Sequence, residues 1–417
     1  MDTINLVRDL GQKAKEASSF LAVASNDTKN RALESARKVI NNNRSSILKA
    51  NQEDLKLGQE KNLSPAMLDR LELNHERLDG LEESLTSISQ QSDPVGKILA
   101  SWDRPSGLRI KRVSTPLGVI GVIFESRPNV TIDASALCLK SGNASILRGG
   151  SDSFYTSKEL HRCFIEGISQ EGFPTASTQL VPTTDRSAVG EMLKLTEFID
   201  VIVPRGGRNL VGRIQHGARV PVFAHLEGIC HVYVDKEADF EKARRVVVNS
   251  KTRRTGICGA AECLLIDRNI PFATGEILLK DLLAKGVEVR TDEKYSKIAG
   301  TVLADDQDYG QEFLDSIIAV KTVSGVNEAI EHIKRYGSGH TEAIITENNS
   351  TAEVFFNNLD SAILMKNAST QFADGGEFGM GAEIGIATGK IHARGPVGTE
   401  QLVSFKYLVE GDGTIRP

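Results

Sequence analysis

The fold is decided by residues 118–124, which read GVIGVIF and form one unbroken apolar run. A run of this length without polar alternation is typical of a strand that is buried on both faces of a parallel sheet. Similar short apolar runs follow, separated by segments with helical spacing, at residues 144–147, 179–181 and 199–203. Strands that alternate with helices predict the α/β class, with a parallel sheet and crossover helices.

A second α/β series follows the first. Its expected strands are residues 262–266, 287–289, 317–320, 343–346 and 362–365. Residues 1–92 are expected to be helical, because apolar side chains recur there at three and four residues. Residues 108–113, LRIKRV, alternate apolar with basic side chains and predict a half-exposed edge strand, which can pair with another subunit. Two α/β lobes with a cleft between them are expected.

Composition excludes several classes of partner. The chain has 417 residues and a net charge of -5, without a long basic run, so neither nucleic acid nor an anionic membrane is an expected partner. Residues 1–21 lack the apolar core of a signal peptide, and no stretch is long enough to span a bilayer. The five cysteines show no CxxC pair or zinc-ligand spacing, so we expect a reduced cytoplasmic protein without a metal. Small molecules are the expected partners.

Two glycine-rich turns are candidate phosphate sites, although the usual nucleotide fingerprints are absent. Arg148, Gly149, Gly150 and Ser151 follow an expected strand and precede a helix, where free amides and an arginine could meet a phosphate. A plain strand-to-helix turn with a surface arginine is the alternative. The second turn contains Gly206 and Gly207 after another strand, and its helix N-terminus could bind a pyrophosphate.

Cys258 is the candidate nucleophile. It stands in TGICGAAE, residues 255–262, a turn with small neighbours that lets a carbonyl group approach the sulfur. Lys251, Arg253 and Arg254 lie nearby in the chain and would favour the thiolate. A cysteine buried at the start of a strand remains the alternative.

Five segments carry a family resemblance. They are PLGVIGVIFESRPNV at 116–130, KSGN at 140–143, ILRGG at 146–150, the Cys258 segment at 249–262 and YGSGHTEAI at 336–344. In this order they resemble the γ-glutamyl phosphate reductase family of the aldehyde dehydrogenase superfamily, and the resemblance extends over essentially the whole chain.

The resemblance implies an aldehyde dehydrogenase-like α/β fold with two Rossmann-like lobes and a small β oligomerisation arm. The cofactor lobe would comprise residues 1–102 and 117–224, together with 366–397. Residues 225–365 would form the catalytic lobe, and residues 103–116 with 398–417 the arm. A homo-oligomer is implied, as is an association with glutamate kinase.

The implied reaction is reduction of L-glutamyl 5-phosphate by NADPH to L-glutamate 5-semialdehyde, in proline biosynthesis. Cys258 would attack the acyl carbon, expel phosphate and form a thioester. The superfamily stabilises the resulting oxyanion with the cysteine's own amide and an asparagine, for which Asn129 is the candidate. The Glu227 segment resembles the superfamily's water-activating glutamate out of register, a departure that favours reduction over hydrolysis; Glu227 could equally be structural.

The resemblance also assigns binding residues. Arg148 near Ser151 favours NADP(H) over NAD, because it could meet a 2′-phosphate. Glu312 resembles the glutamate that orients the nicotinamide ribose, with a surface carboxylate as the alternative. Substrate contacts would come from Arg127, His340, Thr341 and Glu342; His340 taken alone could be a loop histidine. Gly259 departs from the family, where many members carry asparagine.

Two rival functions stay open at this point. One is a hydrolytic semialdehyde dehydrogenase of the same superfamily, which needs a base near Cys258 and no phosphate. The other is a binding or assembly protein without activity, since a fold does not guarantee a reaction.

Overall fold

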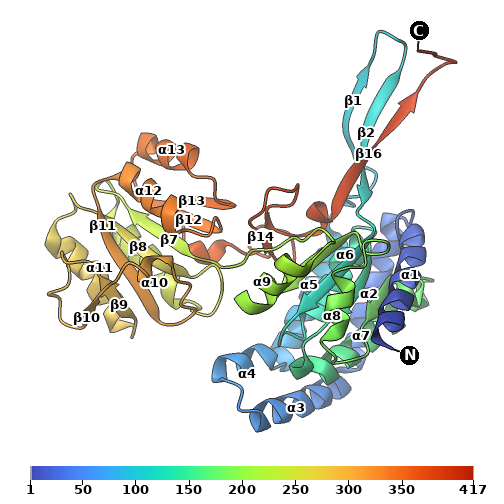
Figure 1. Ribbon diagram of the computed structural model, residues 1–417, viewed down its shortest axis with the longest axis horizontal. Coiled ribbons are helices and arrows are strands. Elements are labelled where there is room, and N and C mark those ends of the chain that lie inside the picture. The colour runs from blue at the N-terminus through green and yellow to red at the C-terminus, as the bar shows by residue number, and fades with distance from the viewer. Residues whose placement is uncertain (1, 417) are drawn as a thin grey trace. The chain divides into compact units, whose positions relative to one another are not determined.

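The computed structural model describes residues 2–416, which divide into two compact units (Figure 1). The first unit comprises residues 1–224, 379–385 and 391–417, and the second comprises residues 225–378 and 386–390. The sequence prediction had assigned all of residues 366–397 to the first lobe. Most of this segment lies with the second unit, because Thr370 N and Gln371 Nε2 donate hydrogen bonds to Ser250, at 3.2 and 2.9 Å.

Residues 3–90 contain the first five helices of the first unit, as the apolar spacing of residues 1–92 predicts. The helices of this unit are α1 (Thr3–Leu21), α2 (Asn26–Asn42), α3 (Arg44–Glu60), α4 (Pro65–Leu71), α5 (His75–Gln90), α6 (Val130–Lys140), α7 (Phe154–Gln170), α8 (Ser187–Met192) and α9 (Arg208–Gly217). Capping side chains fix several starts: Ser25 Oγ accepts from Thr28 N at the start of α2, at 3.1 Å. Gly167 lets α7 approach α2 closely, because a Cβ there would lie 2.5 Å from the Ala36 nitrogen.

The sheet of the first unit is parallel and has the order β5-β4-β3-β6. Its strands are β3 (Val119–Phe124), β4 (Ala144–Arg148), β5 (Thr178–Leu180) and β6 (Val201–Arg205). All six residues of β3 are buried, as the unbroken apolar run predicts. Helices α1 and α6 pack against β4.

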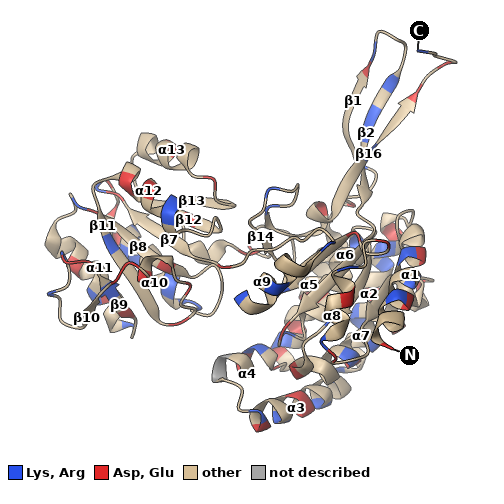
Figure 2. Cartoon of the chain, viewed as in Figure 1, with Lys and Arg blue, Asp and Glu red and all other residues tan. Residues whose placement is uncertain are grey.

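A separate antiparallel sheet forms the arm of the first unit, in the order β1-β2-β16. Its strands are β1 (Ile98–Asp103), β2 (Arg109–Pro116) and β16 (Val403–Glu410); the short strand β15 is Gly395–Pro396. The arm begins at Ile98, before the predicted residue 103. The prediction missed β1 because its sequence, ILASWD, lacks the regular alternation of apolar and polar side chains that marks β2. Figure 2 shows the positions of basic residues along β2 in blue, and Lys111 forms an ion pair with Glu410 of β16 at 3.0 Å.

The second unit has a seven-stranded parallel sheet in the order β10-β9-β11-β8-β7-β12-β13. Its strands are β7 (Cys230–Val234), β8 (Ala261–Asp267), β9 (Glu288–Thr291), β10 (Thr301–Leu303), β11 (Ile317–Val323), β12 (Thr341–Ile345), β13 (Ile363–Lys366) and, outside this sheet, β14 (Ile386–Ala387). Its helices are α10 (Phe240–Thr252), α11 (Phe272–Ala284), α12 (Val326–Tyr336) and α13 (Asn349–Asn358).

Each face of this sheet has its own core. Alternate residues of β7 point to opposite faces: Val232 and Val234 pack with α10 and α11, whereas Tyr233 packs with α12 and α13. Because both faces are covered, β7, β8 and β12 are buried at every residue, as the pattern of a buried parallel sheet predicts.

No helix within residues 2–416 is both long enough and apolar enough to cross a membrane.

Candidate active site

Cys258 lies in the turn between α10 and β8, and it is half-buried while the other four cysteines are buried. Two glycines make room for it. A Cβ on Gly228 would lie 2.6 Å from the Cβ of Cys258, and a Cβ on Gly259 would lie 3.1 Å from the Thr370 carbonyl oxygen. Cys258 therefore lies between two segments of backbone that approach each other closely because residues 228 and 259 lack a side chain.

His225 lies on one side of the sulfur. Its Nδ1 is 2.6 Å from the carbonyl oxygen of Ile386, and because a carbonyl can only accept, Nδ1 carries the proton in this contact. In the neutral ring Nε2 is then left as a proton acceptor. The side chains of His225 and Cys258 interact by a hydrogen bond, so this imidazole can take the thiol proton.

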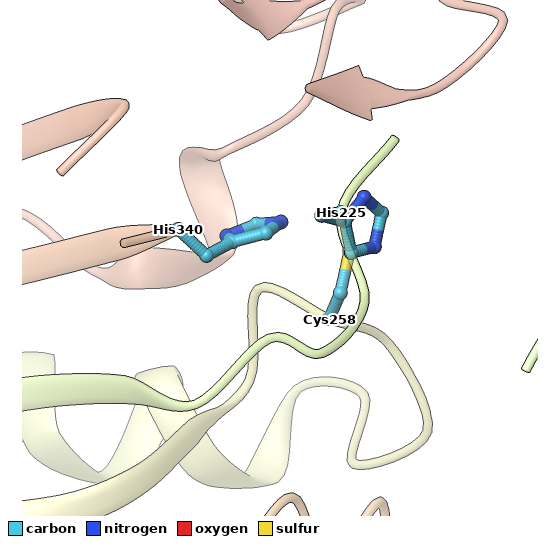
Figure 3. Close-up of side chains that lie close together, drawn as sticks. All are labelled: His225, Cys258 and His340. Atoms are coloured by element: carbon cyan, nitrogen blue, oxygen red, sulfur yellow. The ribbon is translucent and has the colours of Figure 1, made fainter. Parts of the chain in front are cut away.

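His340 lies on the other side, directly before β12. Its Nδ1 is 2.9 Å from Thr341 Oγ1 and 3.6 Å from Cys230 Sγ, and these contacts set the plane of the ring. Its Nε2 is fully buried and has no hydrogen-bond partner of ordinary geometry within residues 2–416. Figure 3 shows the two imidazoles close to the sulfur; their ring centroids are 5.0 Å apart at an interplanar angle of 76°.

The two histidines control the ionisation of Cys258. Burial favours the neutral thiol, but the positive charge and hydrogen bonds of His340 and His225 outweigh it, so the pKa of Cys258 lies well below its usual value. The lowered pKa favours the thiolate, which is the reactive form of a cysteine.

Lys251 does not supply this charge, contrary to the interpretation of the sequence. It forms a fully buried ion pair with Glu262, in which Nζ and Oε2 are 2.6 Å apart. Burial lowers the pKa of Lys251 and raises the pKa of Glu262 to about 7. The sequence leaves open whether His225 has a catalytic role, because no local motif marks it; its only signal is its place beside Glu227 in residues 224–231.

Glu312 supports the turn on the other side of Cys258. Its Oε1 accepts a hydrogen bond from the Gly228 amide at 2.8 Å, and burial raises its pKa. Glu312 thus holds the backbone that touches the nucleophile. Its predicted contact with a nicotinamide ribose stays a prediction.

Thr341 and Glu342 are wholly buried in β12. Thr341 contacts His340, and Glu342 Oε2 accepts from both the backbone amide and Nδ1 of His231, at 3.0 and 2.9 Å. Both side chains act within the protein, and their predicted contact with a substrate gains no support from this geometry. Only His340 of this segment faces the sulfur.

Two other predicted residues, Arg127 and Asn129, lie in the first unit between β3 and α6 and are half-buried. The Asn129 side-chain amide donates to Asp133 at 3.0 Å, and burial raises the pKa of Asp133 to about 6. Asn129 as an oxyanion donor and Arg127 as a substrate contact stay predictions.

The first unit contains a cavity of about 300 Å³ beside the carboxyl ends of β3 and β4. Arg148, Gly150 and Ser151 line it, as do Arg186 and Arg213. Gly149 is the chain neighbour of the lining residue Gly150, and a Cβ at Gly149 would lie in tight contact with the Phe124 ring, at 3.1 Å. The carboxyl ends of parallel strands are where open α/β sheets bind nucleotides.

The guanidinium of Arg148 is directed inward. Its Nη2 donates to the Thr184 carbonyl at 2.9 Å, and its Nε is buried without a partner in the described part of the chain. Burial, together with the positive charge of Arg186, lowers the pKa of Arg148. Two cations this close repel each other, so an anion beside them would be stabilised.

The turn that contains Gly206 and Gly207 already binds an anion, the carboxylate of Glu125. Oε2 of Glu125 accepts from the Gly207 amide at 3.0 Å, and a Cβ on Gly206 would lie 2.5 Å from the same oxygen. The turn therefore binds a carboxylate at the start of α9, as expected of a helix N-terminus. Binding of a pyrophosphate by Gly206 and Gly207 stays a prediction.

The fold is that of the aldehyde dehydrogenase family, whose model matches residues 5–308. The chain is 55% identical to a gamma-glutamyl phosphate reductase of Mesorhizobium japonicum, covering 100% of this chain and 98% of the relative. It is 56% identical to that of Bartonella tribocorum, over 98% and 100% of the two chains. The chain belongs to the gamma-glutamyl phosphate reductases of the aldehyde dehydrogenase family.

Solved structures agree. A crystal structure of gamma-glutamyl phosphate reductase from Thermotoga maritima is 42% identical, with a TM-score of 0.95 over 99% of this chain and 100% of that chain. An acetylating aldehyde dehydrogenase from Geobacillus thermoglucosidasius has a TM-score of 0.71 at 18% identity, over 100% and 98% of the chains, which is a likeness of fold alone. The predicted fold and family are confirmed.

The site generates a prediction about thiol reactivity. At about pH 6.5, where an ordinary thiol of pKa about 8.5 is almost wholly protonated, iodoacetamide should still alkylate wild-type Cys258 rapidly. A depressed pKa keeps the thiolate present down to that lower pH. His225→Ala should slow alkylation at about pH 6.5 by about 10-fold or more, since each pKa unit is a factor of ten, and should leave the rate at about pH 9.5 nearly unchanged.

Mass-spectrometric mapping of the alkylated peptide measures this rate, with Cys258→Ala as the blank and the surface variant His75→Ala as the matched histidine control. A wild-type rate that rises only near the ordinary thiol pKa would rule out the thiolate–imidazolium pair.

Proposed function

We propose that this chain reduces L-glutamyl 5-phosphate with NADPH to L-glutamate 5-semialdehyde and inorganic phosphate, a step of proline biosynthesis. The observation that carries this proposal is the position of the Cys258 sulfur, within 4.8 Å of a ring nitrogen of His225 and of His340, which lower the pKa of the thiol. A thiolate at an open turn is suited to acyl transfer, and the full-length relatives at 55% and 56% identity are named for this substrate.

The chemistry follows from the residues around the sulfur. The Cys258 thiolate attacks the acyl carbon, a carbon–sulfur bond forms, and the carbon–oxygen bond to phosphate breaks. A protonated imidazole, His225 or His340, can give its proton to the departing phosphate oxygen. When bound, NADPH supplies a hydride to the carbonyl carbon of the Cys258 thioester. Collapse of the resulting hemithioacetal anion restores the thiolate and releases the aldehyde.

A requirement for phosphate distinguishes the proposed reaction from the hydrolytic alternative, which needs none. In the reverse direction, NADP⁺ reduction by glutamate 5-semialdehyde should require inorganic phosphate in wild type. Cys258→Ala should lower the rate by about 1,000-fold or more, as expected for loss of a nucleophile, while His75→Ala should keep it. Absorbance at the NADPH band measures both. Turnover without phosphate would support the hydrolytic dehydrogenase, and full activity of Cys258→Ala would refute the nucleophile.

The cavity beside Arg148 fits the phosphorylated adenosine end of NADPH. Arg148 has a buried nitrogen without a partner, and Arg186 adds a second, exposed cation at the same cavity. A 2′-phosphate between them would relieve their repulsion and form charge-assisted hydrogen bonds, which NAD(H) cannot do.

Arg186→Ala should therefore raise the KM for NADPH by about 10-fold or more, equivalent to one charged hydrogen bond, and should leave the KM for NADH nearly unchanged. Steady-state kinetics with both nucleotides measure this split. Arg219→Ala, an exposed arginine outside the cavity, is the matched control. Equal losses for the two nucleotides would contradict a role for Arg186 in reading the 2′-phosphate.

The arm is proposed to join two copies of the chain. Its strands expose large apolar side chains, and a soluble monomer rarely exposes so many of them on one small sheet. They are Ile98, Leu99, Trp102, Phe405, Tyr407, Leu408 and Val409. β1 and β16 are edge strands with free backbone groups, which favour pairing with a second copy. The association with glutamate kinase stays a prediction.

Val409→Asp should shift the mass in solution toward the 45.3 kDa of one chain, because it places a charge on the apolar face. Light scattering coupled to gel filtration measures the mass, and Lys406→Asp, also exposed on β16, is the control. A wild type that is already monomeric at micromolar concentration would overturn the proposed role of the arm.

A further inference from the structure

The three side chains at the nucleophile also make a set of metal ligands. One donor atom each from His225, Cys258 and His340 lies within 4.8 Å of the other two (Figure 3). A cysteine and two histidines are typical ligands of Zn²⁺, which in open sites takes three protein ligands and a water. Tetrahedral coordination at ordinary bond lengths needs donors about 3.5 Å apart, so small side-chain rotations would close the set around an ion.

Each donor atom is oriented for coordination. The Nδ1–H of His225 donates to the Ile386 carbonyl, and such a backbone partner is what fixes the tautomer of metal-binding histidines. Nε2 of His340 is fully buried, has no hydrogen-bond partner of ordinary geometry within the described residues, and faces the sulfur. A buried ring nitrogen without a hydrogen-bond partner is stabilised by a metal ion that accepts its lone pair.

We propose that His225, Cys258 and His340 bind Zn²⁺ or a similar thiophilic divalent cation, and that the bound ion reversibly blocks the enzyme. The sulfur lone pair that would attack the acyl carbon forms the metal–sulfur bond instead. Any proton on Cys258 is released to solvent, and no group is oxidised or reduced. The inhibition rests on the proposed function, whereas the binding does not.

A second group of the same composition lies in the core of the second unit and serves as the internal comparison. It consists of His231, Cys263 and His332, all buried, with Cys263 Sγ 3.6 Å from His332 Nε2. Nδ1 of His231 already forms a hydrogen bond with Glu342 Oε2. An ion could reach these atoms only if the core opened, whereas Cys258 and His225 are partly exposed. The group of His225, Cys258 and His340, which is partly exposed, is therefore the one expected to exchange metal with solvent.

Co²⁺ added to the metal-free full-length protein is the test, because a cobalt–thiolate bond gives a charge-transfer band in the near ultraviolet. The band should appear in wild type, disappear in Cys258→Ala, and need about 10-fold or more Co²⁺ in His225→Ala. Zn²⁺ should displace Co²⁺ and protect Cys258 from iodoacetamide, and a chelator should reverse both effects. His75→Ala should behave as wild type.

The outcomes separate this inference from the proposed function. A band that survives in Cys258→Ala but is lost in Cys263→Ala would place the ion in the buried group and overturn the proposal. No band, with turnover and alkylation unaffected by excess Zn²⁺, would also overturn it while leaving the reductase intact. A band and Zn²⁺ protection in a protein without acyl phosphate reduction would support the metal site and refute the proposed function alone. Should Cys263→Ala fail to fold, peptide mapping of the protected cysteine decides between the two groups.

Discussion

The site depends on the direction of three neighbouring strands. β8, β7 and β12 are adjacent and parallel, so all three begin at the same edge of the sheet. Cys258 precedes β8, His225 and Gly228 precede β7, and His340 directly precedes β12. Residues far apart in the chain meet because parallel pairing brings the starts of their strands together. An antiparallel β12 would place its His340 end at the opposite edge of the sheet.

Buried polar contacts hold the turn that carries Cys258. Lys251, in the last turn of α10, is paired with Glu262 of β8 at the other end of the turn. Gln371 donates to the carbonyls of Ser250 and Arg254 at 2.9 and 3.2 Å. Buried ion pairs contribute little net stability, but removal of one partner leaves an unpaired charge in the core. The pair therefore fixes the conformation of the turn more than it stabilises the protein.

Sequence reasoning located what is encoded locally. Apolar runs predicted most of the buried strands of both sheets, and the small residues around Cys258 marked it as the candidate nucleophile. The prediction missed β7, which reads CHVYV and has a histidine within its apolar run, and β10, whose three residues are too few for a periodic signal. It also credited Lys251 with activating the thiol, because nearness in the chain does not reveal that Glu262 neutralises this lysine. The role of His225 depends on the carbonyl of Ile386, which lies 161 residues away, and no spacing rule reaches that far.

The arm draws its strands from distant parts of the chain, since β16 is made by residues 403–410 and pairs along the whole of β2. During synthesis, β1 and β2 leave the ribosome long before β16 does. A two-stranded ribbon is marginally stable in water. A nascent chain therefore carries no complete arm until residues 403–410 have been synthesised, and the order of synthesis delays any contact that the arm makes.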